Sequence, residues 1–275
     1  MKTDNILEYG ILNGEDVSKD EMDKSLCRDC IKVYDVIRLI NGKPLYLENH
    51  LERLNRSINL AGYSYHYKEE TFKKDIEKLV VKSGMTSNNI KTTFFENDKS
   101  VRIMYMVKSF YPSKEDYRDG YKTLLIYEER ENPNAKILNE ERRTLINKIL
   151  RETGANEAIF VSEDKKILEG SRSNLFFVKG EKIITSPDDK VLLGTIRQKI
   201  IEICKNNNIS VIKREILLDE LSFFNGAFIT GTSIDIMPLA KIDNIKYNTN
   251  NKVIKRLSKF FEKDRNDYLK NYIRL

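Results

Sequence analysis

Two short segments in the second half of the chain combine residue types that could hold a phosphorylated ring. The first is Glu169-Gly-Ser-Arg-Ser-Asn174, which follows the apolar pair Ile167-Leu168, so a hairpin here would turn the Glu169 carboxylate inward. The second is Gly194-Thr195-Ile196, which opens a helical pattern and offers backbone N–H groups and a positive dipole end to an anion. A buried carboxylate and an anion site together suit a heterocyclic phosphate cofactor.

A lysine and an arginine upstream could complete such a site. Lys136 lies in Pro133-Asn-Ala-Lys-Ile-Leu-Asn139, at the end of a loop and just before a helical pattern. Burial and nearby positive charge favour the neutral amine, which can form an imine and move a proton. Arg53 lies in His50-Leu-Glu-Arg-Leu54, and a guanidinium can bind two phosphate oxygens at once. Each residue alone would more often be a solvated surface charge.

Taken together, these motifs resemble the class IV family of pyridoxal-phosphate (PLP) enzymes. That family includes branched-chain aminotransferase, D-amino-acid aminotransferase and aminodeoxychorismate lyase. The interval of 33 residues from Lys136 to Glu169, and the Glu157-Ala158 pair between them, fit the family pattern. The resemblance spans most of the chain and implies an α/β fold like that of D-amino-acid aminotransferase. It predicts a small α/β domain over residues 1–119 and a larger mixed α/β, PLP-binding domain over residues 120–275.

The resemblance also implies a role for each matching residue. Lys136 would be the Schiff-base lysine and the carrier of the substrate α-proton, and the Glu169 carboxylate would keep the pyridine nitrogen of PLP protonated. The residues expected to hold the phosphate are Arg53, Thr195, Ile196, Thr232 and Ser233. The chain reads Gly-Thr-Ile-Arg where the family commonly reads Gly-Ile-Thr-Arg, so the threonine hydroxyl sits one place early.

Tyr34 and Arg38 are candidates for substrate binding. They are four residues apart on an expected strand and so share one face. In relatives the matching strand lines the substrate pocket; the alternative is a core tyrosine and a surface arginine. The usual Gly-Asp-Gly before this strand is replaced by Asp29-Cys30-Ile31-Lys32, and the segment 108–115 lacks the Arg-x-His carboxylate trap of the D-specific enzymes. The amino acid and its enantiomer are therefore left open.

The resemblance predicts an aminotransferase that moves an amino group between an amino acid and a 2-oxo acid, with PLP as cofactor and no metal. The alternative is an aminodeoxychorismate lyase, which would use the same site to release pyruvate and 4-aminobenzoate. A third reading, from another class, is a PLP-type fold without catalysis or a basic binding module. The resemblance also predicts a homodimer.

Composition indicates a folded globular protein and argues against a nucleic-acid or membrane partner. The chain has 275 residues, of which 40% are apolar, and this is enough for a sizeable core. The net charge of +6 is spread along the whole length, so no nucleic-acid partner is expected. No apolar run is long enough to span a membrane and the N-terminus lacks a signal-peptide core, so we expect a cytoplasmic protein without a membrane partner.

The three cysteines do not suggest a disulfide framework. Cys27 and Cys30 form a Cys-x-x-Cys motif that could be a redox pair or half of a zinc site. Without a second pair of ligands at suitable spacing, two reduced thiols are the expectation. Cys204 falls on the apolar face of an expected helix and is predicted to lie in the core.

Apolar periodicity and turn residues outline the elements that would position these side chains. Asn41-Gly42 is a hairpin turn, and Leu47, Leu51, Leu54 and Ile58 form one helical stripe, with Arg53 off it. Residues 111–120 are expected to join the two domains. Further strands are expected at 32–40, 90–96, 101–108, 121–127, 158–161, 167–168, 175–178, 182–185, 209–212 and 227–230, and helices at 49–61, 68–82, 140–153, from 195 and from 253.

Overall fold

The structure is a computed structural model that describes residues 2–26 and 29–273. Contacts divide the chain into two compact units. Unit 1 comprises Met1–Phe110, Ala135–Leu138 and Arg265–Leu275, and unit 2 comprises Tyr111–Asn134 and Asn139–Asp264. Two later segments of the chain thus belong with the first unit. The simple division into domains at residue 119 stays a prediction.

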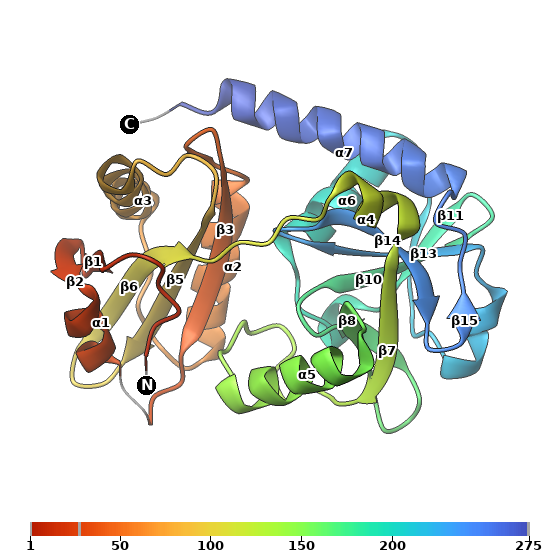
Figure 1. The fold of residues 1–275 in the computed structure, drawn as a ribbon, viewed down its shortest axis with the longest axis horizontal. Helices are drawn as coiled ribbons and strands as arrows, with labels where there is room; N and C mark the ends of the chain where they lie inside the picture. Colours follow the sequence, from red (N-terminus) through yellow and green to blue (C-terminus); the bar gives the residue numbers. More distant parts are fainter. Residues whose placement is uncertain (1, 27–28, 274–275) are drawn as a thin grey trace. The chain divides into compact units, whose positions relative to one another are not determined.

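Unit 1 contains a six-stranded sheet in the order β2-β1-β6-β5-β3-β4, in which all neighbours are antiparallel (Figure 1). The strands are β1 (Tyr9–Leu12), β2 (Glu15–Ser18), β3 (Val33–Ile40), β4 (Lys43–Pro44), β5 (Asn89–Glu96) and β6 (Ser100–Val107). The predicted turn between β3 and β4 is confirmed, with φ values of 53° at Asn41 and 71° at Gly42. Such left-handed values are what a tight hairpin turn requires.

Helices cover both faces of this sheet. One core cluster joins alternate residues of β3, such as Val33 and Ile37, to Leu54 of α2 (Leu47–Leu60) and Phe72 of α3 (Glu69–Ser83). A second cluster forms around Met22 of α1 (Lys19–Ser25) on the other face. The side chains of β3 therefore alternate between a core buried under α2 and the opposite face.

Unit 2 contains a nine-stranded mixed sheet in the order β12-β11-β10-β13-β14-β7-β8-β9, with β15 paired to β14. The pairs β11/β12, β14/β7 and β7/β8 are parallel, and the others are antiparallel. The strands are β7 (Tyr121–Tyr127), β8 (Glu157–Val161), β9 (Ile167–Gly170), β10 (Asn174–Lys179), β11 (Lys182–Thr185), β12 (Val211–Lys213), β13 (Gly226–Gly231), β14 (Asp235–Ile242) and β15 (Ile245–Lys246). β9 and β10 carry the two ends of the predicted glutamate motif.

The helices that complete unit 2 include two that sequence analysis predicted closely. Unit 2 contains α4 (Lys114–Asp119), α5 (Glu140–Thr153), α6 (Thr195–Asn206) and the short 3-10 turns η1 (Asp188–Lys190) and η2 (Leu218–Phe223). It also contains the first part of α7 (Lys252–Asn271), whose residues from Arg265 onward belong to unit 1. The bounds of α5 match the expected range, and α6 begins where predicted. The segment expected only as a join holds α4, because Ser113 and Asp116 form a reciprocal cap at its start.

The cysteines agree with expectation at one position and differ at another. Cys204 is buried in α6, and burial raises the pKa of its thiol to about 12, so it is an unreactive core residue. The expectation of a reduced thiol is wrong for Cys30, which is disulfide-bonded in this structure. Cys27 lies outside the described residues.

Candidate functional site

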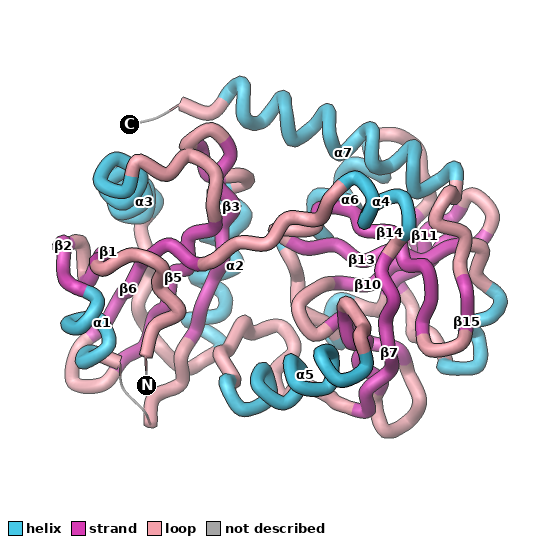
Figure 2. Tube along the Cα trace, in the orientation of Figure 1, coloured by secondary structure: helices cyan, strands magenta, loops and turns pink. Residues whose placement is uncertain are grey.

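Lys136 lies in the long loop between β7 and α5 (Figure 2) and is anchored on unit 1 by its own backbone. Its N–H donates to Ser57 Oγ over 3.1 Å, and its carbonyl accepts from Tyr34 N–H over 3.0 Å. Leu138 N–H donates to the carbonyl of Lys32 over 2.8 Å. The loop therefore pairs with the start of β3 like a short added strand, and this fixes the backbone from which the Lys136 side chain extends.

The predicted substrate residues Tyr34 and Arg38 share one face of β3. Tyr34, Val36 and Arg38 are half-buried and alternate with fully buried neighbours. The ammonium Nζ of Lys136 lies 4.7 Å from the centroid of the Tyr34 ring, a distance typical of a cation–π contact. The structure thus brings Tyr34 and Lys136 together. Arg38 lies further along the same face, opposite Asn89 of β5.

Arg53 is buried in α2 and is bound by an acidic residue of β3. Its Nε donates to Asp35 Oδ2 over 2.8 Å, and its Nη2 donates to Asp35 Oδ1 over 2.7 Å. His50 Nδ1 lies 2.7 Å from the same Oδ1 atom. Burial alone would raise the pKa of Asp35, but Arg53 and His50 outweigh it and hold that pKa below its ordinary value. Burial lowers the pKa of His50, so its imidazole is kept neutral.

Glu169 lies at the end of β9 in unit 2, and its carboxylate is buried as predicted. Its Oε2 atom accepts hydrogen bonds of 3.0 Å from Asn174 Nδ2 and from the N–H of Leu192. Its Oε1 atom lies 3.0 Å from Arg130 Nε. This contact is an ion pair rather than a directed hydrogen bond, since Arg130 Nε makes no hydrogen bond within the described chain. Each carboxylate oxygen of Glu169 therefore has a polar or charged partner.

A second buried carboxylate, Glu157, shapes the turn between Glu169 and Asn174. It accepts hydrogen bonds from the hydroxyls of Ser171 and Ser173 and from the N–H of Arg172. The Ser-Arg-Ser sequence therefore supplies donors to Glu157, and this explains why the Glu157-Ala158 pair accompanies the motif.

The start of α6 has the features of an anion site. Gly194 is its N-cap and provides no side-chain acceptor to the first turn. A Cβ atom at Gly194 would meet Asn174 Oδ1 at 2.1 Å, so only glycine allows this close approach. The Thr195 hydroxyl is buried and has no hydrogen-bond partner among the described residues. Such an orphaned hydroxyl beside helix N–H groups fits an external oxygen ligand.

Thr232 and Ser233 lie in the turn between β13 and β14, also in unit 2. Both are half-buried. The turn is closed by a hydrogen bond of 3.2 Å from Ile234 N–H to the carbonyl of Gly231. Unit 2 therefore carries Glu169, the start of α6 and this turn, whereas unit 1 carries Tyr34, Arg38, Arg53 and Lys136.

Sequence analysis missed three ionisable residues of these surroundings: Asp35, His50 and Arg130. Asp35 interrupts an apolar strand, and a carboxylate at a core position of a strand is a signal that could have been used. His50 lies one helical turn before Arg53, so it could also have been considered. Arg130 lies in Glu128-Glu129-Arg130-Glu131, which resembles a solvated charge run and gives no such signal.

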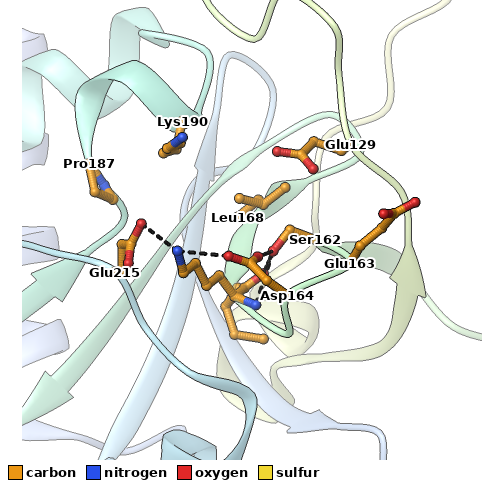
Figure 3. Close-up of a pocket in the computed structure, with 10 residues that line it drawn as sticks. Glu129, Ser162, Glu163, Asp164, Leu168, Pro187, Lys190 and Glu215 are labelled. Atoms are coloured by element: carbon orange, nitrogen blue, oxygen red, sulfur yellow. Dashed lines mark hydrogen bonds and ion pairs between the residues drawn. The ribbon is translucent and has the colours of Figure 1, made fainter.

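A hollow of about 280 Å³ in unit 2 contains none of the predicted site residues (Figure 3). Its charged lining is mostly exposed, and Lys166 Nζ pairs there with Asp164 over 2.7 Å and with Glu215 over 2.8 Å. We assign no role to it. Within residues 2–26 and 29–273, no cluster of three or more acidic, histidine or cysteine side chains could hold a metal ion. The helices in the same ranges are too short or too polar to cross a membrane.

Comparison with known proteins assigns the family. Residues 32–242 match the model of the family described as amino-transferase class IV. A Rickettsia typhi protein, provisionally named a branched-chain-amino-acid aminotransferase, is 25% identical over 224 residues, which cover 77% of this chain and 78% of that protein. A D-alanine aminotransferase from Bacillus licheniformis is 25% identical over 235 residues, covering 77% and 78%.

A solved structure shares the fold. The branched-chain amino acid aminotransferase of Escherichia coli has a TM-score of 0.82 and 21% identity, covering 94% of each chain. This likeness confirms the predicted α/β fold. Since the family model matches well over half of the sequence, the chain belongs to the class IV aminotransferase family of PLP-dependent enzymes.

Proposed function

We propose that this chain is an aminotransferase that uses PLP to move an amino group between an amino acid and a 2-oxo acid. One observation in the structure carries most weight. The Thr195 hydroxyl is buried without a hydrogen-bond partner in the described chain, at a helix start whose cap supplies no side-chain acceptor. This donor set fits the phosphate of PLP, because phosphate oxygens accept from both hydroxyl and N–H donors.

The residues assigned to the phosphate are those that the family resemblance implies, and each is described within its own unit. In unit 2, the N–H groups of Thr195 and Ile196 and the Thr195 hydroxyl form one donor group, and the turn of Thr232 and Ser233 supplies further hydroxyl and amide donors. In unit 1, Arg53 supplies a full positive charge. The threonine of this chain lies one position before that of the family's common Gly-Ile-Thr order. This does not prevent the assignment, because the Thr195 hydroxyl is itself buried and has no hydrogen-bond partner within the described residues.

Glu169 is assigned to the ring nitrogen of PLP. PLP, when bound, supplies an electron sink for the charge left at the substrate α-carbon, provided that its ring nitrogen stays protonated. Asn174 and the Leu192 N–H fix the plane of the Glu169 carboxylate through Oε2. A carboxylate anion at this position, balanced by Arg130 beside Oε1, can hold that ring proton.

Lys136 is assigned as the residue that binds PLP covalently and moves the substrate α-proton. Ser57 accepts from the Lys136 N–H and the Tyr34 N–H donates to the Lys136 carbonyl, so the side chain extends from a fixed backbone. A base held in this way needs little reorganisation before each proton transfer. The Tyr34 ring contacts the ammonium group at 4.7 Å and limits the directions open to it.

Tyr34 and Arg38 are assigned to the substrate, with Arg38 pairing the α-carboxylate. Arg38 lies on the same face of β3 as Tyr34, and a guanidinium pairs well with a carboxylate. Arg38→Ala should therefore raise KM for the amino acid more than it lowers kcat. A loss confined to kcat would contradict this assignment.

The covalent role of Lys136 can be tested by borohydride reduction of the purified protein. Reduction should fix PLP to the chain, and peptide mapping should place the label on Lys136. A label on another lysine would contradict the assignment, and failure to retain PLP at all would contradict the proposed function.

A substrate panel separates the aminotransferase from the lyase. L- and D-amino acids, each offered with 2-oxoglutarate or pyruvate, should yield the corresponding 2-oxo acid in at least one pair. If no amino acid reacts while aminodeoxychorismate yields pyruvate and 4-aminobenzoate, the lyase alternative is correct and the aminotransferase proposal is wrong.

The proposal includes a homodimer, which the family resemblance implies. It also includes action in the cytoplasm, which is favoured by a sequence without an apolar run of membrane-spanning length. Light scattering at micromolar concentration should give twice the chain mass of 32.2 kDa. A fully active monomer would contradict the dimer. Cell fractionation tests the location.

A further inference from the structure

Asp35 is a carboxylate in the middle of an apolar core. It lies on the face of β3 that also carries Val33, Ile37 and Leu39, and all four side chains are at most 1% exposed. An isolated charge in such a place would cost several kcal/mol. The sequence therefore keeps an acidic residue at a position where an aliphatic residue would pack well, and this position lies one residue after Tyr34.

α2 presents a row of polar residues to this carboxylate. His50, Arg53 and Ser57 are spaced as neighbours along one side of the helix, next to the apolar stripe that contains Leu54, and all three are buried. Ser57 Oγ donates to the carbonyl of Arg53 over 2.8 Å. The row therefore runs from Asp35 to the residue that anchors the Lys136 peptide group.

The contacts of Arg53 use only part of its guanidinium. Asp35 binds Nε and Nη2 through separate oxygens, at 2.8 and 2.7 Å. This bidentate arrangement fixes the plane of the group. Nη1 takes no part in these two bonds. The pair adds little to the stability of the fold compared with an apolar pair of the same volume, so its orienting effect is the more distinctive consequence.

We propose that Asp35 is a positioning residue that locks the Arg53 guanidinium in one orientation and leaves Nη1 for the phosphate of PLP. This inference rests on the proposed function, in which Arg53 binds that phosphate. His50 supports the arrangement, because its Nδ1 atom contacts the Asp35 oxygen that Arg53 Nη2 also uses. Asp35 itself does not touch the cofactor in this proposal.

The test compares two ligands that differ only in the phosphate. The cofactor-free full-length protein is titrated with PLP and with pyridoxal, and the ratio of the two affinities reports the phosphate contribution. Asp35→Asn should lower this ratio about tenfold or more, the scale of one charge-assisted hydrogen bond. Arg53→Ala should lower it at least as much, and adding Asp35→Asn to Arg53→Ala should change it little further.

Asp75→Asn is a matched control. Asp75 is a buried carboxylate of α3 in the same unit, and it accepts a hydrogen bond from the Tyr67 hydroxyl. Its variant also loses a buried carboxylate but should leave the PLP to pyridoxal ratio unchanged. An equal fall in both aspartate variants would mean that the ratio follows general destabilisation, and this would overturn the proposal.

The outcomes separate the inference from the proposed function. A normal ratio in Asp35→Asn with a lowered ratio in Arg53→Ala overturns the positioning role and leaves the Arg53 assignment standing. A normal ratio in both variants overturns the inference and the Arg53 assignment together. Absence of PLP binding by the wild-type protein removes the proposed function.

A measurement on the wild-type chain keeps the inference testable if Asp35→Asn does not fold. The side-chain nitrogen signals of Arg53 are followed by NMR in arginine-labelled protein, with Arg53→Lys used for assignment. PLP should shift Nη1 and leave Nε nearly unchanged, whereas pyridoxal should shift neither. A large change at Nε on addition of PLP would show that Asp35 does not hold the guanidinium, and it would overturn the proposal.

Discussion

Arg130→Met should destabilise the cofactor-free protein because it removes the positive charge beside a buried carboxylate. Glu169 Oε1 lies 3.0 Å from Arg130 Nε, and the side chains are 4% and 15% exposed. Removing one partner of a buried pair costs about 3 to 5 kcal/mol. Glu169 keeps the hydrogen bonds from Asn174 and Leu192, so we expect the low end of this range, about 3 kcal/mol of unfolding free energy.

Arg130 and Glu169 can each be replaced by an uncharged residue, alone or together, and the resulting variants form a double-mutant cycle. Glu169→Gln leaves Arg130 with a hydrogen bond of 3.2 Å to the carbonyl of Ser171 and with some access to water, so it should cost about 1 to 2 kcal/mol. In Glu169→Gln the arginine no longer balances a charge. Arg130→Met should therefore cost about 2 kcal/mol less in that background than in the wild type.

Urea unfolding followed by far-UV circular dichroism suits this assay, because the chain contains no tryptophan. Arg142→Met is the matched control, since Arg142 pairs with Glu128 in the same unit over 3.3 Å but both side chains are partly exposed. A surface pair of this kind contributes at most about 1 kcal/mol. Equal costs for Arg130→Met and Arg142→Met, or strictly additive effects in the cycle, would refute the reasoning.

Three further outcomes are expected. Lys136→Ala should abolish covalent retention of PLP after borohydride reduction, seen by intact mass, and lower turnover by several orders of magnitude; retention of both would exclude Lys136 from the mechanism. Thr195→Val should leave the unfolding free energy of the cofactor-free protein nearly unchanged, because the buried hydroxyl has no hydrogen bond within the described residues. The same variant should weaken PLP binding about tenfold in titrations, and an unchanged affinity for PLP would place the phosphate elsewhere. The folded-state pKa of Asp35 is lowered, so the stabilising contribution of its carboxylate is complete at neutral pH and is lost as the pH falls below about 4. Asp35→Asn should therefore flatten the fall in unfolding free energy between about pH 7 and 3. Parallel plots of unfolding free energy against pH for the variant and the wild type would contradict this.

Local signals explain which elements of the fold could be predicted. α5 has an apolar period and ends at a glycine in a left-handed conformation, and its bounds match the expected range. The Asn41-Gly42 turn likewise carries its own conformational preference. The hairpin of β1 and β2 was missed because β2 reads Glu-Asp-Val-Ser, and one apolar residue in a short strand shows no period.

The candidate site was predictable where several residues act in one continuous segment. The segment that contains Glu169 could be identified because its serines, asparagine and carboxylate occur together. Arg53 was expected off the apolar stripe of its helix, yet it is buried, because a carboxylate eighteen residues earlier pairs with it. Arg130 pairs with Glu169 across an even longer gap in sequence. Ion pairs between distant residues depend on the sheet topology, and no local pattern encodes them.

The short segment Ala135–Leu138 belongs to unit 1 although the residues on either side of it belong to unit 2, and this limits how the chain could be divided into fragments. A fragment ending at residue 119 would contain the whole six-stranded sheet, yet the Tyr34 N–H and the Lys32 carbonyl would lose their backbone partners. It would also lack Tyr268, whose hydroxyl accepts from Leu47 N–H and whose ring packs on Tyr46. We therefore expect such a fragment to need both missing pieces, supplied as peptides or by circular permutation, before it folds as it does in the full chain.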